Sequence, residues 1–379
     1  MHLTLNLTTS CNMNCTYCYA PPRPGPAMSE QTAFAALELG ARLNHESCGI
    51  AFFGGEPLLH KDLIAAVVER GRAMEKEGKG HFHFKLTTNG LLLDDAFLQL
   101  AQREHIMLAM SVDGVEQAHD AHRRLADGSP SFEPVRASLA RLLAAKPYAS
   151  VICVVNPDTA RHLSESIAWL LDAGCRYLIV VLNHAADWTE RDFGMLEKQY
   201  RKLATLYRQW TRAGRKFYFS PFETKISSHV NRHCYHKDRC ELGNRQLSVD
   251  TEGYLYPCVQ FPRAGHQSRW CIGNVIDGVD EKARQAIRAE SETEKAFCRD
   301  CVIKDRCNNT CGCLNWQTTG DINAISPVLC RNEQLLTTIV DRLAEKLYRE
   351  REPHFLQKHY SDAYPVLSLL EDLGYPGNR

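Results

Sequence analysis

The sequence predicts an α/β fold: a partial (β/α)6 barrel, then a C-terminal cysteine-rich domain and a terminal helical tail. Short aliphatic and β-branched runs alternate with amphipathic helical segments up to residue 183. Ten of the 16 cysteines then fall between Cys234 and Cys330, where helical periodicity fades. A regular apolar helical stripe returns only beyond residue 334.

Six predicted strands build the barrel. Strands that alternate with helices form βαβ units, which pair in parallel through right-handed crossovers. The segment 61–77 is one such helix, because Leu63, Ile64, Val67 and Val68 fall on one face. Six units are too few for a closed eight-stranded barrel, so we expect an open one. The six strands are residues 3–9, 50–53, 83–88, 106–112, 150–155 and 177–182.

The chain divides into four predicted regions. The barrel takes residues 1–214 and ends in a long charged helix near 190–215, and a bridging segment covers 215–233. The cysteine-rich domain, 234–333, is held by bound metal more than by an apolar core. The tail, 334–379, is helical, with an apolar stripe formed by Leu335, Leu336, Ile339, Val340, Leu343 and Leu347.

Charge and composition exclude several classes of protein. Lys+Arg and Asp+Glu number 45 each, so the chain lacks the cationic excess of a typical nucleic-acid binder. No apolar run approaches the ~18 residues of a membrane helix, and no signal peptide precedes the first strand. We expect a cytoplasmic protein with no nucleic-acid or membrane partner. Thiols stay reduced there, so the cysteines indicate metal binding or catalysis more than disulfides.

The first cysteine cluster directly follows the first strand, as Cys11-x3-Cys15-x2-Cys18 with Tyr19 after it. Three thiolates cannot by themselves complete a tetrahedral structural zinc site. They can hold three irons of a [4Fe–4S] cluster and leave the fourth iron open to a reactant. The alternative is a zinc loop whose fourth ligand comes from elsewhere in the chain.

This motif, at the start of a six-unit α/β chain, resembles the radical S-adenosylmethionine (SAM) enzymes. The resemblance implies that SAM chelates the open iron and is cleaved by an electron from the cluster. A 5′-deoxyadenosyl radical then abstracts hydrogen from the substrate, while the protein supplies binding and shielding.

The resemblance also implies which residues bind SAM. They follow the predicted strands: a Gly-Gly-Glu-Pro segment after the second, Asn89 after the third, and Ser-Val-Asp-Gly after the fourth. Each segment is also a good turn sequence. The implied SAM contacts are Tyr19, Gly54, Gly55, Glu56, Pro57, Asn89, Ser111, Asp113 and Arg124.

The C-terminal cysteines resemble a SPASM domain, the extension of radical SAM enzymes that carries two auxiliary [4Fe–4S] clusters. The pattern includes Gly253-x4-Cys258 and the run C-x2-C-x5-C-x3-C from Cys298. Cysteine-only zinc sites remain the alternative, and Cys313 is a bystander or a competing ligand. The resemblance assigns Cys234, Cys240, Cys258 and Cys311 to the first auxiliary cluster, and Cys298, Cys301, Cys307 and Cys330 to the second.

This resemblance implies an enzyme that oxidises ribosomally made peptides to a thioether or carbon–carbon crosslink. The alternatives are a sulfatase-type maturase, a small-molecule radical SAM oxidoreductase, and a non-enzymatic iron–sulfur electron carrier or redox sensor. Sulfatase-maturing enzymes carry an Asp after the third cysteine of the first auxiliary cluster. Val259 stands there in this chain and cannot take a proton, so we favour crosslinking.

The expected partners are a peptide or protein substrate and a reductant such as flavodoxin or ferredoxin. Many peptide maturases begin with a domain that binds the leader of the substrate peptide. In this sequence the first barrel strand is predicted to start at Leu3. We therefore expect any leader to be bound by a separate protein or by another surface.

Overall fold

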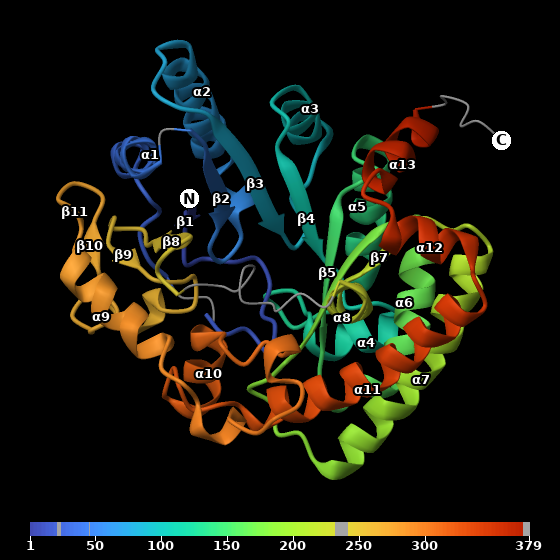
Figure 1. The fold of residues 1–379 in the computed structure, drawn as a ribbon. Helices are drawn as coiled ribbons and strands as arrows, with labels where there is room; N and C mark the ends of the chain where they lie inside the picture. Colours follow the sequence, from blue (N-terminus) through green and yellow to red (C-terminus); the bar gives the residue numbers. More distant parts are fainter. Residues whose placement is uncertain (21–23, 45, 232–241, 374–379) are drawn as a thin grey trace.

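Figure 1 shows the computed structural model, which describes residues 1–20, 24–44, 46–231 and 242–373. A nine-stranded sheet runs in the order β7-β6-β5-β4-β3-β2-β1-β8-β9, and its pairs are parallel except β8 with β9. The α/β fold and partial barrel are thereby confirmed. The strands are β1 (His2–Asn6), β2 (Cys48–Phe53), β3 (Phe82–Thr88), β4 (Met107–Ser111), β5 (Ser150–Val155), β6 (Tyr177–Leu182), β7 (Tyr218–Phe219), β8 (Gln246–Val249) and β9 (Leu255–Tyr256). A separate hairpin pairs β10 (Gly273–Asn274) with β11 (Gly278–Val279).

Several helices begin at caps that the sequence supplies. Ser29 caps α1 and Asp94 caps α3, each accepting a hydrogen bond from a first-turn N–H, and Thr189 with Asp192 forms a capping box on α7. None of the helices in the described ranges is long and apolar enough to cross a membrane. The α-helices are α1 (Glu30–Leu43), α2 (Lys61–Lys76), α3 (Asp95–Arg103), α4 (Glu116–His122), α5 (Phe132–Ala145), α6 (Leu163–Asp172), α7 (Glu190–Arg212), α8 (Ser220–Val230), α9 (Glu281–Ser291), α10 (Gly312–Thr319), α11 (Pro327–Arg349), α12 (Pro353–Tyr360) and α13 (Tyr364–Asp372).

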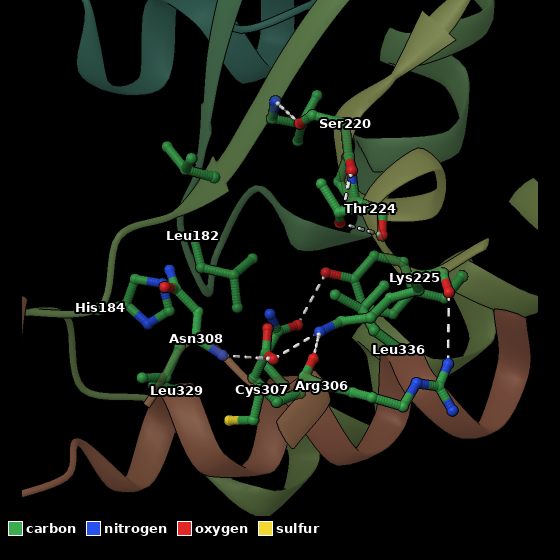
Figure 2. Close-up of a pocket in the computed structure, with 16 residues that line it drawn as sticks. Leu182, His184, Ser220, Thr224, Lys225, Arg306, Cys307, Asn308, Leu329 and Leu336 are labelled. Carbon is green, nitrogen blue, oxygen red and sulfur yellow. Dashed lines mark hydrogen bonds and ion pairs between the residues drawn. The ribbon is translucent and has the colours of Figure 1, made fainter. Parts of the chain in front are cut away.

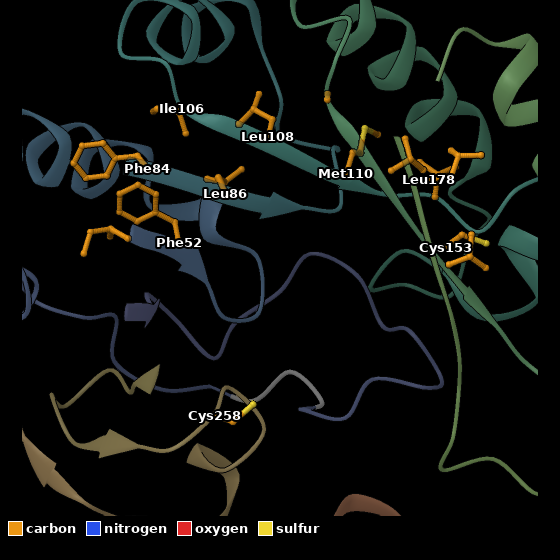
Figure 3. Packing of buried hydrophobic residues seen from close by; sticks show 14 of the residues in the cluster. Phe52, Phe84, Leu86, Ile106, Leu108, Met110, Cys153, Leu178 and Cys258 are labelled. Atoms are coloured by element: carbon orange, nitrogen blue, oxygen red, sulfur yellow. The ribbon is translucent and has the colours of Figure 1, made fainter. Parts of the chain in front are cut away.

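The core lies between the sheet and the helices that connect its strands. Figure 3 shows Phe52 of β2 beside Phe84 of β3; their rings stack with centroids 5.9 Å apart. Leu86, Leu108 and Met110 continue this buried layer along β3 and β4. Each buried side chain of this size contributes about 1.5–3 kcal/mol by leaving water. These buried contacts hold β2, β3 and β4 together, and the candidate functional site lies at the carboxyl ends of these strands.

The cysteine-rich region is joined to the barrel sheet. Its strand β8 pairs in parallel with β1, and Asn6 Nδ2 donates to Ser248 Oγ and to the Val249 carbonyl oxygen, both at 2.8 Å. At the other end, α11 begins at Pro327 and runs across residue 334, the predicted start of the tail. The cysteine-rich region therefore continues the barrel sheet through β8.

Candidate functional site

The candidate site lies at the carboxyl ends of β1 to β4. Parallel strands bring these ends to one edge of the sheet, and α/β folds bind ligands there. The loop after β1 carries the first three cysteines, and the loop after β2 carries Gly54 and Gly55. Asn89 follows β3, and Asp113 follows β4. The structure therefore brings together the segments that the sequence predicted to share a site.

Two glycines join the first two of these loops. Gly55 N–H donates to the Thr8 carbonyl oxygen at 2.8 Å, and Glu56 N–H donates to that of Ser10 at 2.9 Å. A Cβ atom on Gly55 would lie 2.0 Å from the Ser10 oxygen. Gly54 has φ +128°, a conformation that side chains rarely adopt. The Gly-Gly pair therefore permits a close approach between the β2 loop and the cysteine loop.

Glu56 links the β2 loop to the end of β3. Its buried carboxylate accepts hydrogen bonds from Leu58 N–H at 3.0 Å, from Thr88 Oγ1 at 2.8 Å and from Asn89 N–H at 2.8 Å. Burial raises its pKa, and these donors oppose that rise. Asn89 Nδ2 donates to Asn12 Oδ1 at 2.7 Å and lies 3.7 Å from Cys11 Sγ. Glu56 therefore positions Asn89 against the cysteine loop.

The three thiols of that loop form a soft donor set. Cys11, Cys15 and Cys18 are each partly exposed, and burial raises the pKa of all three. Met13 N–H points to Cys11 Sγ at 3.4 Å, a donor that favours the thiolate form. Three cysteines with backbone donors suit an iron–sulfur cluster, whose sulfur ligands are tuned by such contacts. In the described ranges, no three His, Cys, Asp or Glu side chains are arranged to hold a single metal ion.

Tyr17 and the buried side chains of Asp113 and Arg123 form a hydrogen-bonded cluster that includes a residue of the cysteine loop. Tyr17 OH donates to Asp113 Oδ2 at 2.6 Å, and Arg123 Nη1 donates to Tyr17 Oη at 2.8 Å. Asp113 also accepts from Val154 N–H at 3.0 Å. Burial opposes the charge of Arg123, yet Tyr17 and Asp113 raise its pKa overall. Arg123 Nε has no hydrogen-bond partner within the described residues, so this guanidinium retains one free donor next to the cysteine loop.

The other predicted SAM contacts occupy different settings. Arg124 Nη1 donates to the Gly128 carbonyl oxygen at 3.1 Å, in an exposed turn. Ser111 ends β4, and Tyr19 lines a cavity with Gly54 and Gly55. The sequence analysis did not name Arg123 as a site residue. Arg123 and Arg124 directly follow α4, which ends at His122, and side chains of adjacent residues point in different directions.

The C-terminal cysteines gather in two groups. In one, Cys311 Sγ lies 3.5 Å from Cys313 Sγ, and hydrogen bonding by the Cys313 thiol lowers the pKa of Cys258 and, to about 7, that of Cys311. Cys313 therefore lies with the predicted ligands of the first auxiliary cluster. Two further predicted ligands, Cys234 and Cys240, lie outside the described residues.

The second group contains Cys298, Cys301, Cys307 and Cys330, the four thiols assigned to the other auxiliary cluster. Burial raises the pKa of Cys330, and the charges of Cys298 and Cys301 add to that rise. Cys298 also raises the pKa of Cys307, after burial and Glu333. Four cysteine thiols are the ligand set of a [4Fe–4S] cluster, as for the first loop.

Figure 2 shows how Cys307 is held. Lys225 of α8 and Glu333 of α11 form an ion pair at 2.6 Å, and their side chains are only 5% and 8% exposed. Lys225 Nζ donates to the Arg306 carbonyl oxygen at 2.7 Å, and Glu333 Oε2 accepts from Asn308 N–H at 3.0 Å. The residues on both sides of Cys307 are therefore fixed by one buried pair. Glu333 and Cys330 lie one turn apart on α11.

Comparison with known proteins defines the class of this chain. The pattern of the Radical SAM superfamily matches residues 5–170, which span the cysteine loop and strands β2 to β5. This part of the chain is a radical SAM domain, and the protein is an enzyme of radical chemistry. Anaerobic sulfatase-maturating enzymes are among its sequence relatives.

The cysteine-type enzyme of Clostridium perfringens is 21% identical over 332 residues, covering 80% of this chain and 86% of that protein. The serine-type enzyme of Klebsiella aerogenes is 23% identical over 323 residues, covering 80% of this chain and 77% of that protein.

Solved structures agree on the fold. The anSMEcpe enzyme with bound AdoMet superposes with a TM-score of 0.79 at 17% identity, over 92% of this chain and 99% of that chain. SuiB of Streptococcus suis, bound to S-adenosylmethionine, gives a TM-score of 0.59 at 14% identity, over 86% of this chain and 76% of that chain.

Proposed function

We propose that this enzyme cleaves SAM reductively and uses the resulting radical to oxidise a side chain of a peptide or protein. The arrangement of Cys11, Cys15 and Cys18 beside Asn89 and the Glu56 loop carries the proposal. An electron carrier or redox sensor would need cysteines but would not need the β2 and β3 loops that enclose them. The radical SAM superfamily match supports the same conclusion.

The cluster and SAM, when bound, supply the radical chemistry, and the residues of this chain hold and orient them. Cys11, Cys15 and Cys18 would hold such a cluster through three of its irons, and the fourth iron would be open to SAM. Gly54, Gly55, Glu56, Pro57, Asn89 and Ser111 form the wall against which SAM binds, and Tyr19 flanks it. We assign Asp113 to holding Tyr17 and Arg123, and we assign the cationic contact near SAM to Arg123 in preference to Arg124, whose guanidinium donates to the Gly128 carbonyl oxygen.

Two auxiliary clusters complete the proposal. We expect about twelve irons and twelve sulfides per chain after anaerobic reconstitution, because three cubes contribute four of each. The check is a paired assay of iron and acid-labile sulfide, with zinc measured in the same samples. About four irons per chain, with zinc bound at the C-terminal cysteines, would contradict the presence of the auxiliary clusters.

A peptide substrate is supported by the relatives. The anSMEcpe structures include one with bound AdoMet and the Cp18Cys peptide, and SuiB has been solved with its precursor peptide SuiA. The sequence relatives favour oxidation of a single Cys or Ser side chain over crosslinking. This reverses the preference drawn from Val259. We therefore propose side-chain oxidation first and crosslinking second, with a flavodoxin or ferredoxin as the reductant and a separate leader-binding protein if the substrate has a leader.

Mass spectrometry of peptides after anaerobic reaction tests the proposal. The reduced, reconstituted enzyme is incubated with SAM and with two synthetic peptides that differ only in Cys or Ser at one position. Conversion of that residue to an aldehyde, trapped by a hydrazide, supports side-chain oxidation. Loss of two hydrogens with fragmentation blocked between two residues supports crosslinking. Unchanged peptides, in a preparation that makes 5′-deoxyadenosine, would contradict both peptide functions.

A further inference from the structure

A cavity of about 420 Å³ joins the radical SAM loops to the cysteine-rich region. Gly54 and Gly55 line it from β2, Tyr19 lines it from the cysteine loop, and Val259 lines it beside Cys258. Position 259 is where the sulfatase-maturing enzymes carry their proton-accepting Asp, as noted from the sequence. The substrate side of the site therefore includes this cavity, but its expected base is a valine.

The cavity also contains an unsatisfied acceptor. Gln260 Oε1 is buried and has no hydrogen-bond partner within the described ranges of the chain. A buried acceptor without a partner costs about 1–3 kcal/mol, which a bound donor removes. A peptide N–H is one donor that would satisfy this oxygen.

Most of the titratable groups that line the cavity are committed to other contacts. Asp250 accepts from Glu252 N–H, Tyr254 N–H and Tyr256 OH at 2.9–3.0 Å. Arg263 donates to the Tyr19 carbonyl oxygen and lies 4.7 Å above the Trp316 ring. Burial raises the pKa of Tyr19, which keeps its hydroxyl protonated.

The remaining titratable residues of the lining, Glu252 and His266, form a pair. His266 Nδ1 lies 4.0 Å from Glu252 Oε2, and the imidazole stacks on Tyr254 with centroids 4.7 Å apart and planes 13° apart. Nδ1 thus faces the carboxylate, and Nε2 has no hydrogen-bond partner among the described residues. The two side chains are 46% and 59% exposed and their separation is longer than a hydrogen bond, so the stacking on Tyr254 is the contact that orients the imidazole. A histidine held by a ring contact, with Nε2 free, can act as a general base.

We propose that His266, held by its stacking on Tyr254 with Glu252 nearby, is the base that takes a proton from the substrate side chain; this rests on the proposed peptide oxidation. The 5′-deoxyadenosyl radical removes one hydrogen atom from the carbon and becomes 5′-deoxyadenosine. The carbon radical then loses the proton of its neighbouring O–H or S–H to His266 Nε2. It also loses one electron to a one-electron acceptor of the iron–sulfur class. A C=O or C=S bond forms, and protons and electrons balance.

The test compares H266N with wild type as reconstituted holoenzymes, using the Cys and Ser peptides above. We expect H266N to retain iron and to form 5′-deoxyadenosine, while oxidised peptide falls by about 10²–10⁴-fold, the usual contribution of a general base. E252Q should also form 5′-deoxyadenosine and lose oxidised peptide, but by a smaller factor than H266N. H81N, an exposed histidine at the amino end of β3, is the matched control and should match wild type.

The possible outcomes separate the two claims. Oxidised peptide from H266N at the wild-type level would overturn the role of His266 and leave the proposed function intact. Equal loss of 5′-deoxyadenosine and peptide product in H266N would also overturn it, because the residue would then act before proton removal. Wild-type enzyme that forms 5′-deoxyadenosine but leaves both peptides unchanged would overturn the proposed function and, with it, this inference.

Discussion

Replacement of Cys15 by Ala is expected to abolish 5′-deoxyadenosine release. Cys15 is the middle thiol of the loop after β1, and a cluster left with two cysteine ligands lacks its attachment to the site. SAM then has no iron to chelate and no source for the electron that cleaves it. The measurement is chromatographic quantitation of 5′-deoxyadenosine after anaerobic reduction with SAM present. We expect C15A to fall below the detection limit.

Cys271 provides the matched control for that experiment. Its thiol lies 3.5 Å from the Gly273 carbonyl oxygen, in a setting where a serine hydroxyl keeps the same hydrogen bond, and no cluster is assigned to it. C271S should therefore release 5′-deoxyadenosine as wild type does. If C15A retained wild-type release, the radical assignment of the cysteine loop would be wrong.

Replacement of Lys225 by Met is expected to cost about 3–5 kcal/mol of unfolding free energy, because it leaves Glu333 buried without its cation. The same change frees the 306–308 segment that holds Cys307, since Lys225 Nζ donates to the Arg306 carbonyl oxygen. We therefore also expect about four irons fewer per chain, the content of one cube. Urea unfolding under anaerobic conditions and iron assay are the two measurements.

Two further variants test whether the unpaired charge of Glu333 causes the loss of stability in K225M. K225M/E333L removes both charges and should recover part of the lost stability, since no buried charge is left unpaired, although Asn308 N–H then loses its acceptor. R201M removes an exposed partner of Glu197 on α7 and should change stability by less than about 0.5 kcal/mol. A K225M protein as stable as R201M and with full iron content would contradict the role of this pair.

Much of the barrel could be predicted from local pattern. Strands β5 and β6 coincide with the predicted 150–155 and 177–182, because both are runs dominated by aliphatic and β-branched residues. The other four strands differ by a few residues at their ends. The pairing of β8 with β1 was not predictable, since it joins residues more than 240 positions apart through strands of four and five residues. Local periodicity carries no information about such a contact.

The candidate site was predictable to the level of its loops. Glycines, turn residues and cysteines after successive strands indicated where ligands bind. The partners of each side chain were not predictable: Asp113 bonds to Tyr17, which lies 96 positions away, and Arg123 turns inward while Arg124 does not. Such choices depend on tertiary packing, which motif spacing does not encode.

The central claim, radical oxidation of a peptide side chain, is tested most directly by following deuterium. A synthetic Cys peptide deuterated at Cβ of that residue is incubated with SAM and the reduced enzyme, and the 5′-deoxyadenosine is examined by mass spectrometry. If the radical takes the hydrogen from Cβ, we expect 5′-deoxyadenosine that carries one deuterium, in amounts equal to the oxidised peptide. Unlabelled 5′-deoxyadenosine together with unchanged peptide would contradict it.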